Sequence, residues 1–209
     1  GRQADNSLRP VEEGYALSYQ AATRALEINP DYAPAHSRLG WITMHNQGDL
    51  AAAARHYQRA VELDPADTGV MFSAASLAES LGRLDQAIAL EEYAVVRDPL
   101  DPVAHNNQGD SYLSAGRFDQ AIAAFRTALR LSPGYIGAHY RIGVALLLKG
   151  EPHAALEAMQ QEPFKAWRLI GLAMAHHALD QQAESDAALA ELIQRYEQDA
   201  AYNIAYVIA

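Results

Sequence analysis

The sequence of 209 residues contains no cysteine. Disulfide frameworks, thiolate nucleophiles and zinc sites built on cysteine are therefore excluded. A chain without disulfides suits the cytoplasm and the periplasm alike, and we expect a cytoplasmic protein, with the periplasm as the alternative. Residues 1–10 lack the charged and then apolar pattern of a signal peptide, and we expect them to form a flexible leader.

Positive charge is scarce. The sequence has 16 lysines and arginines and 26 acidic residues, so the formal net charge is −10. This balance, with an isoelectric point near 5.2, argues against partners held by bulk positive charge, such as nucleic acid or an anionic membrane surface. No apolar run approaches the eighteen or more residues of a membrane-spanning helix. Hydrophobic residues nevertheless make up 50% of the chain, which is enough for a buried core.

An internal repeat is the main feature that is present. Residues 82–89 (GRLDQAIA) and 116–123 (GRFDQAIA) differ at one position and lie 34 residues apart. Small residues, glycines, alanines and prolines recur at the same or nearly the same interval. They are Gly40, Ala75, Gly109 and Gly143; Gly48, Gly82, Gly116 and Gly150; Ala25, Ala60, Ala94 and Ala128; and Pro30, Pro65, Pro99 and Pro133.

Each recurring residue has a mechanical role in a pair of helices, here named A and B. The first small residue lets helix A approach helix B closely, and the glycine that follows ends helix A where a positive φ is tolerated. The alanine allows helix B to pack tightly on the next pair, and the proline then ends helix B. One pair cannot bury its own apolar face, so the pairs must stack. The pattern predicts an all-α, right-handed superhelical solenoid of antiparallel helix pairs.

These repeats resemble those of the tetratricopeptide repeat (TPR) family. The resemblance covers the chain from residue 11 onwards and indicates one solenoid over 11–209, with four clear repeats within 11–150 and degenerate ones over 150–209. We expect helix B of the first repeat at Val11–Ile28, followed by repeats at 33–65, 68–99 and 102–133 and a fifth beginning at residue 136. The last segment, 200–209, is expected to be an unpartnered first helix of a truncated repeat.

Three departures from the period are informative. The interval from Gly40 to Gly48 is one residue longer than its equivalents, which predicts a π-type or wide turn within 41–47. Pro163 falls where helix B of the fifth repeat should continue, so that helix should be short, with a sixth pair at about 164–179 and 182–196. Finally, residues 200–209 match only the first helix of a further pair, and the apolar side chains of this expected helix predict a weak homodimer through it.

No phosphate-binding loop, metalloprotease motif or nucleophile elbow is present, and we expect neither catalytic residues nor a cofactor or metal. His36, His105 and His139 recur at one position of helix A, and we interpret them as packing residues rather than metal ligands. Paired carboxylates such as Glu91-Glu92 are interpreted as solvated helix faces. Five aromatic residues are interpreted as core, namely Tyr57, Tyr93, Tyr112, Phe125 and Trp167.

The TPR resemblance implies that the A helices line a concave groove. The candidate groove residues are Arg38, Trp41, Phe72, Ser76, Asn106, Asn107, Asp110, Tyr140, Arg141 and Val144. Asparagine can bond a peptide main chain, and arginine can fork onto a carboxylate. The TPR subclass that clamps acidic chaperone tails uses lysines that are missing here, although Asn107 and Arg141 match it.

Residues 162–169 and 187–192 are similar to the C-terminal TPR arrays of bacterial multidomain regulators, which carry a TolB-like, adenylate-cyclase or winged-helix domain upstream. That similarity implies a segment of a larger regulatory protein. We therefore predict a protein–protein interaction scaffold that binds a peptide or partner protein, but neither nucleic acid nor membrane. The alternative is a structural spacer or self-association segment with no ligand in the groove.

Overall fold

The computed structural model describes residues 11–196, and every regular element in this range is a helix. The predicted leader over 1–10 and the predicted helix over 200–209 lie outside the described residues. Within 11–196, no helix combines the length and the hydropathy that a membrane span requires.

The chain divides into two compact units, residues 1–94 and 95–209, with the division near the end of α5. The first unit contains α1 (Val11–Ile28), α2 (Ala33–Ile42), the π-helix η1 (Thr43–Gln47), α3 (Leu50–Leu63), α4 (Thr68–Ser80) and most of α5 (Leu84–Arg97). The second contains α6 (Pro102–Ser114), α7 (Phe118–Leu131), α8 (Ala138–Leu148), α9 (Pro152–Gln160), α10 (Lys165–Ala178) and α11 (Gln182–Tyr196).

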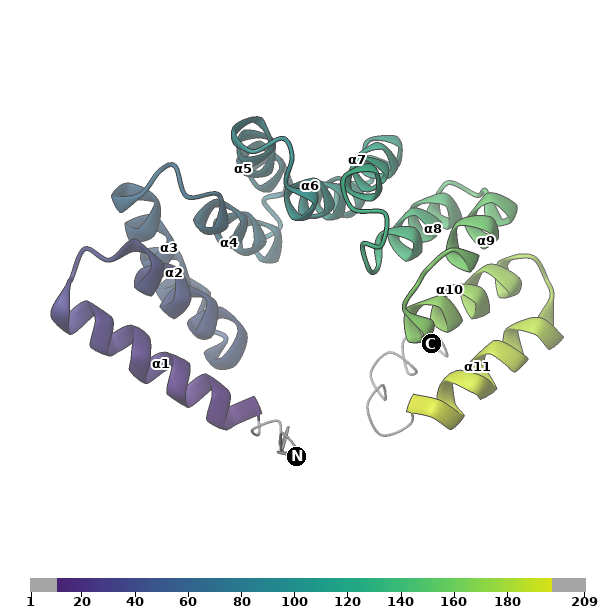
Figure 1. Cartoon of the computed structure of the whole chain (residues 1–209), viewed down its shortest axis with the longest axis horizontal. Helices are drawn as coiled ribbons and strands as arrows, with labels where there is room; N and C mark the ends of the chain where they lie inside the picture. Colours follow the sequence, from purple (N-terminus) through teal and green to yellow (C-terminus); the bar gives the residue numbers. More distant parts are fainter. Residues whose placement is uncertain (1–10, 197–209) are drawn as a thin grey trace, which may run out of the picture. The chain divides into compact units, whose positions relative to one another are not determined.

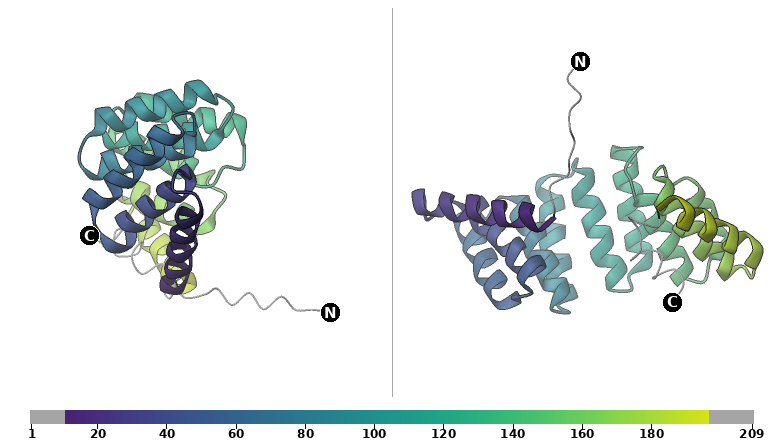
Figure 2. Two further views of the ribbon diagram at one scale, coloured as in Figure 1. Left: turned by 90° about the vertical axis from the view of Figure 1, so that its left-hand side faces the viewer. Right: turned by 90° about the horizontal axis from the view of Figure 1, so that it is seen from below.

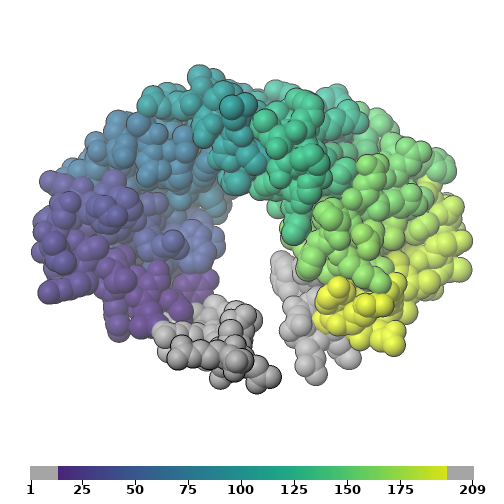
Figure 3. Space-filling model, in the orientation of Figure 1, coloured from purple at the N-terminus to yellow at the C-terminus, as the bar shows by residue number. Residues whose placement is uncertain are grey.

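Within each unit, consecutive helices pack side by side as antiparallel pairs (Figure 1 and Figure 2). The space-filling view shows neighbouring colours in contact within each unit, as expected when helices stack in sequence order (Figure 3). The prediction of an all-α stack of helix pairs is confirmed, and α1 has the bounds expected for helix B of the first repeat.

The recurring glycines end the A helices as predicted. Gly48, Gly82, Gly116 and Gly150 all have positive φ, between 68° and 78°. After α6, the N–H of Arg117 donates to the carbonyl of Tyr112 at 2.8 Å, which closes the helix end around the left-handed glycine. These local stops explain why the helix boundaries follow the repeat so closely.

The small residues of helix A mark where helix B approaches. A Cβ built on Gly109 would lie 2.5 Å from the ring of Phe125, and one on Gly143 would lie 2.4 Å from Met159. Gly40 faces Tyr57 in the same way, at 2.8 Å. Tyr57, Phe125 and Met159 are fully buried or nearly so, so this glycine-to-large-residue contact lies at the centre of these three pairs.

The inserted residue within 41–47 forms η1, a π-helix of five residues that continues α2. The N–H of Gly48 bonds the carbonyl of Thr43, five residues earlier, so the extra residue is absorbed before the turn. The predicted π-type turn is confirmed.

Over residues 150–196, the degenerate repeats also fold as predicted. Helix α9 has nine residues and ends at Gln160, before Pro163, and the sixth pair forms as α10 and α11. One core assignment is wrong, because Tyr93 on α5 is 45% exposed, whereas Tyr57, Tyr112 and Phe125 are buried. Trp167 is only half-buried.

Candidate functional site

The candidate groove residues lie on the A helices, which are α2 and α4 in the first unit and α6 and α8 in the second. In the first unit, Arg38 is exposed, and Trp41, Phe72 and Ser76 are half-buried. In the second unit, five are half-buried, namely Asn107, Asp110, Tyr140, Arg141 and Val144. Asn106 differs from expectation, because it is only 4% exposed and its side chain offers a ligand almost no surface.

Arg38 and Trp41 line a hollow of about 240 Å³ between α2 and the start of α4. Its α2 wall follows the helical period, since Pro34, Ser37, Arg38 and Trp41 are spaced to share one face. The α4 wall consists of Asp67, Gly69, Val70 and Ser73. Neither Phe72 nor Ser76 lines this hollow, so the structure brings together only part of the predicted set.

Trp41 is the centre of an aromatic stack that the sequence analysis missed. The ring of Tyr15 on α1 stacks on Trp41 with centroids 5.5 Å apart, and His45 on η1 stacks on it at 4.7 Å. His45 Nδ1 lies 3.0 Å from the carbonyl oxygen of Trp41. The only local signal for this stack was the four-residue spacing of Trp41 and His45, because Tyr15 comes from another helix.

A second hollow, of about 270 Å³, lies where α1 meets η1. Its lining is rich in tyrosine and carboxamide side chains and consists of Tyr15, Ala16, Tyr19, Gln20, Ile42, Asn46 and Gln47. Tyr15 therefore borders this hollow while stacking on Trp41, which borders the other. Carboxamides can donate to and accept from a peptide main chain, and π-helical segments often occur at functional sites.

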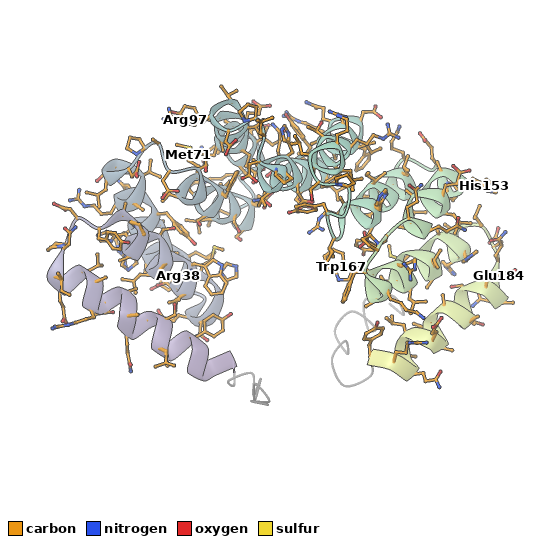
Figure 4. All side chains as sticks on the ribbon, viewed as in Figure 1. Arg38, Met71, Arg97, His153, Trp167 and Glu184 are labelled. Carbon is orange, nitrogen blue, oxygen red and sulfur yellow. The ribbon has the colours of Figure 1, made fainter. Side chains whose placement is uncertain are left out.

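In the second unit, the polar candidates bond to one another. Arg141 Nε donates to Asp110 Oδ1 at 2.6 Å, and Asn106 Nδ2 lies 3.4 Å from Asp110 Oδ2. The Arg141 guanidinium lies over the ring of Trp167, 5.1 Å from its centroid, and Tyr140 meets the same ring edge-on at 5.4 Å. Figure 4 shows Trp167 at the start of α10.

A buried carboxylate fixes the start of α8, and with it Tyr140 and Arg141. Glu162, in the turn after α9, is fully buried and accepts N–H groups from Gly137, Tyr140 and Phe164 at 3.0–3.3 Å. Gly137 has φ +89°, and a Cβ there would lie 2.5 Å from both Arg141 and Trp167. Sequence reasoning missed Glu162, because its partners at the start of α8 lie more than twenty residues earlier in the chain.

The recurring histidines have structural partners. Nε2 of His36 lies 3.0 Å from the carbonyl of Pro30, and Nε2 of His105 lies 3.0 Å from that of Pro99. Both therefore tie the start of an A helix to the preceding turn. Burial lowers the pKa of His139 below its ordinary value, which keeps this imidazole neutral near pH 7.

Comparisons with known proteins agree with this arrangement. A family model described as tetratricopeptide repeat matches residues 15–67, 46–102 and 106–167. A search of curated proteins found no significant match.

Solved structures with the same fold share little sequence with this chain. TTC0263, a thermophilic TPR protein of Thermus thermophilus, is 20% identical, with 85% of this chain and 99% of that one covered and a TM-score of 0.71. PilW, a type IV pilus biogenesis factor, is 17% identical to this chain; the match covers 95% of this chain and 92% of PilW, with a TM-score of 0.79. YrrB, described as a TPR protein with an unusual peptide-binding site, is 16% identical to this chain. The match covers 91% of this chain and 98% of YrrB, with a TM-score of 0.58.

Proposed function

Because the chain belongs to the tetratricopeptide repeat family, we propose that it is a protein-interaction module that binds an extended peptide segment of a partner on its A-helix face. Proteins of this family generally mediate protein–protein interactions and are typically scaffolds without catalytic activity. Following the similarity of residues 162–169 and 187–192, the module would serve within a larger, cytoplasmic bacterial regulator.

One observation carries the proposal, namely the two hollows of the first unit, one lined by Trp41 and the other by its stacking partner Tyr15. Together they offer an indole, tyrosine rings, hydroxyl groups, carboxamides and one arginine. An aromatic anchor beside groups that bond a main chain is the combination that recognition of an extended peptide needs. By contrast, the second unit directs its groove arginine onto its own Asp110.

Panning the whole chain against random twelve-residue peptides displayed on phage tests the proposal. Selected peptides, made as fluorescent synthetic copies, should bind the wild-type chain and lose affinity for Trp41→Ala. The matched control is Tyr93→Ala, which removes an exposed aromatic ring from the B helix α5. Failure to select any peptide, or equal binding to both variants, would contradict binding on the A-helix face.

The self-contained polar cluster of the second unit favours a second candidate function. Asp110, Arg141, Tyr140 and Trp167 contact one another, as expected on a face that takes no ligand. In this alternative the chain is a structural spacer or self-association segment. Light scattering that shows concentration-dependent dimers, together with an empty peptide selection, would support it.

A further inference from the structure

The two groove arginines occupy the same position of the repeat but differ in their partners. Arg141 on α8 forms a salt bridge with Asp110 at 2.6 Å, so its charge is already balanced. Among the described residues, no carboxylate forms a salt bridge with Arg38 on α2. The Arg38 guanidinium instead lies over Trp41, 5.8 Å from the ring centroid.

The setting of Arg38 leaves its guanidinium accessible. Arg38 is exposed (Figure 4). It lines the hollow between α2 and α4 with the hydroxyl-bearing Ser37 and Ser73. A guanidinium held against an aromatic face can present its N–H fork to a carboxylate in bidentate geometry. Such charge-assisted pairs are stronger than neutral hydrogen bonds.

The acidic residue of this hollow has a role of its own. Asp67 Oδ1 accepts the N–H groups of Gly69 at 2.8 Å and Val70 at 3.2 Å, and so caps α4. The cap places the negative charge of Asp67 at the positive end of the α4 dipole, which partly offsets it. Arg38 is therefore the group of this hollow that remains for an anionic ligand.

Resting on the proposed function, we infer that Arg38 recognises an aspartate or glutamate side chain within the bound peptide, next to a residue that packs on Trp41. The carboxylate is assigned to a side chain rather than to the end of the peptide. The C-terminal carboxylate of a peptide is commonly held by several donors, whereas the one cationic group among the described residues that line this hollow is the Arg38 guanidinium. The inferred partner segment is thus extended and acidic at one position, although the chain itself carries a net charge of −10.

The test compares the peptides selected from the same phage library by three forms of the whole chain. These are the wild type, Arg38→Gln, and Arg55→Gln, which removes the same charge from an exposed position on α3. The wild type and Arg55→Gln should enrich an acidic residue at one fixed position, and Arg38→Gln should lose that enrichment. Circular dichroism should show the same melting temperature for the three proteins, because both arginines are exposed.

Soluble copies of a selected peptide then locate the carboxylate. Replacing its acidic residue with the amide should weaken binding to the wild type about tenfold or more, and should have little effect on binding to Arg38→Gln. Amidation of the peptide's C-terminus should leave affinity unchanged. Loss of affinity on amidation alone would overturn the assignment to a side chain.

The outcomes separate this inference from the proposed function. Peptides without acidic enrichment, or with enrichment that persists in Arg38→Gln, would overturn the role of Arg38 and leave peptide binding standing. A library that yields no binder to the wild type would overturn both.

Discussion

At the scale of single residues, three helix pairs depend on a glycine of helix A that faces a large residue of helix B. Gly109 is the tightest case against an aromatic ring, because its added Cβ would lie 2.5 Å from the fully buried Phe125. Gly14 is also helical, but it has open space around its Cβ position. The same substitution should therefore have opposite effects at the two sites.

We expect Gly109→Ala to lower the free energy of unfolding, because an overpacking cost of about 1–3 kcal/mol outweighs the gain in helix propensity. Gly14→Ala should raise it by about 0.5–1 kcal/mol. Urea unfolding of both variants measures these values. A stabilised Gly109→Ala would show that Phe125 moves away at little cost.

Glu162 carries a second prediction, since its carboxylate satisfies backbone donors at the start of α8. Glu162→Ala would leave these N–H groups without their acceptor in a buried site, and we expect a loss of about 2–4 kcal/mol of unfolding free energy. The control is Glu157→Ala, an exposed position on α9, which should stay within about 0.5 kcal/mol of the wild type. Equal effects in urea unfolding would remove Glu162 from this role.

The sequence alone predicted only some of the candidate groove contacts. Arg38 and Trp41 could be placed together from helical spacing, because they lie three residues apart on one helix. The burial of Asn106 depends on its neighbours in the folded unit, and the partners of Glu162 and Tyr15 lie on other segments. Contacts of this kind are not encoded within one repeat, so spacing could not reveal them.

At the scale of helices, the boundaries could be predicted because the stops are local. Left-handed glycines end the A helices of the four clear repeats, prolines follow their B helices, and a count of residues between Gly40 and Gly48 located η1. The stacking of Tyr15, Trp41 and His45 could not be predicted, because it depends on how α1 meets η1.

The contact between α2 and α3 gives a pH-dependent prediction. His56 on α3 lies beside His36, with their Nδ1 atoms 3.5 Å apart, and burial, followed by the nearby His36 and Arg55, lowers the pKa of His56. Between this lowered pKa and 6.5, the unfolded chain binds more protons than the folded chain. Unfolding free energy should therefore fall as the pH drops below about 6.5.

Urea unfolding at pH 7.5 and 5.5 measures this dependence. His56→Gln should lose less stability than the wild type over the interval, whereas His177→Gln, at an exposed position, should behave like the wild type. An unchanged pH dependence in His56→Gln would assign the effect to other groups, among them His139, whose pKa is also lowered.

At the scale of the whole molecule, a stack of antiparallel helix pairs could be predicted from the period, because a helix pair repeated about every 34 residues has few alternatives to stacking. The TPR family itself was indicated by resemblance. One continuous solenoid over 11–209 and weak dimerisation through 200–209 stay predictions. Function was harder to predict, because the same fold presents one arginine to solvent and pairs another internally.

Binding of a peptide on the A-helix face of the first unit can be measured directly, because the chain contains two tryptophans. Trp41 lies in the first unit and Trp167 in the second, so ¹⁵N-labelled protein gives one indole signal from each, assigned with Trp41→Phe. Titration with a selected acidic peptide should shift the Trp41 signal to saturation and leave that of Trp167 nearly unchanged. A peptide that binds while the Trp41 signal stays in place would show that the ligand site lies elsewhere on the protein.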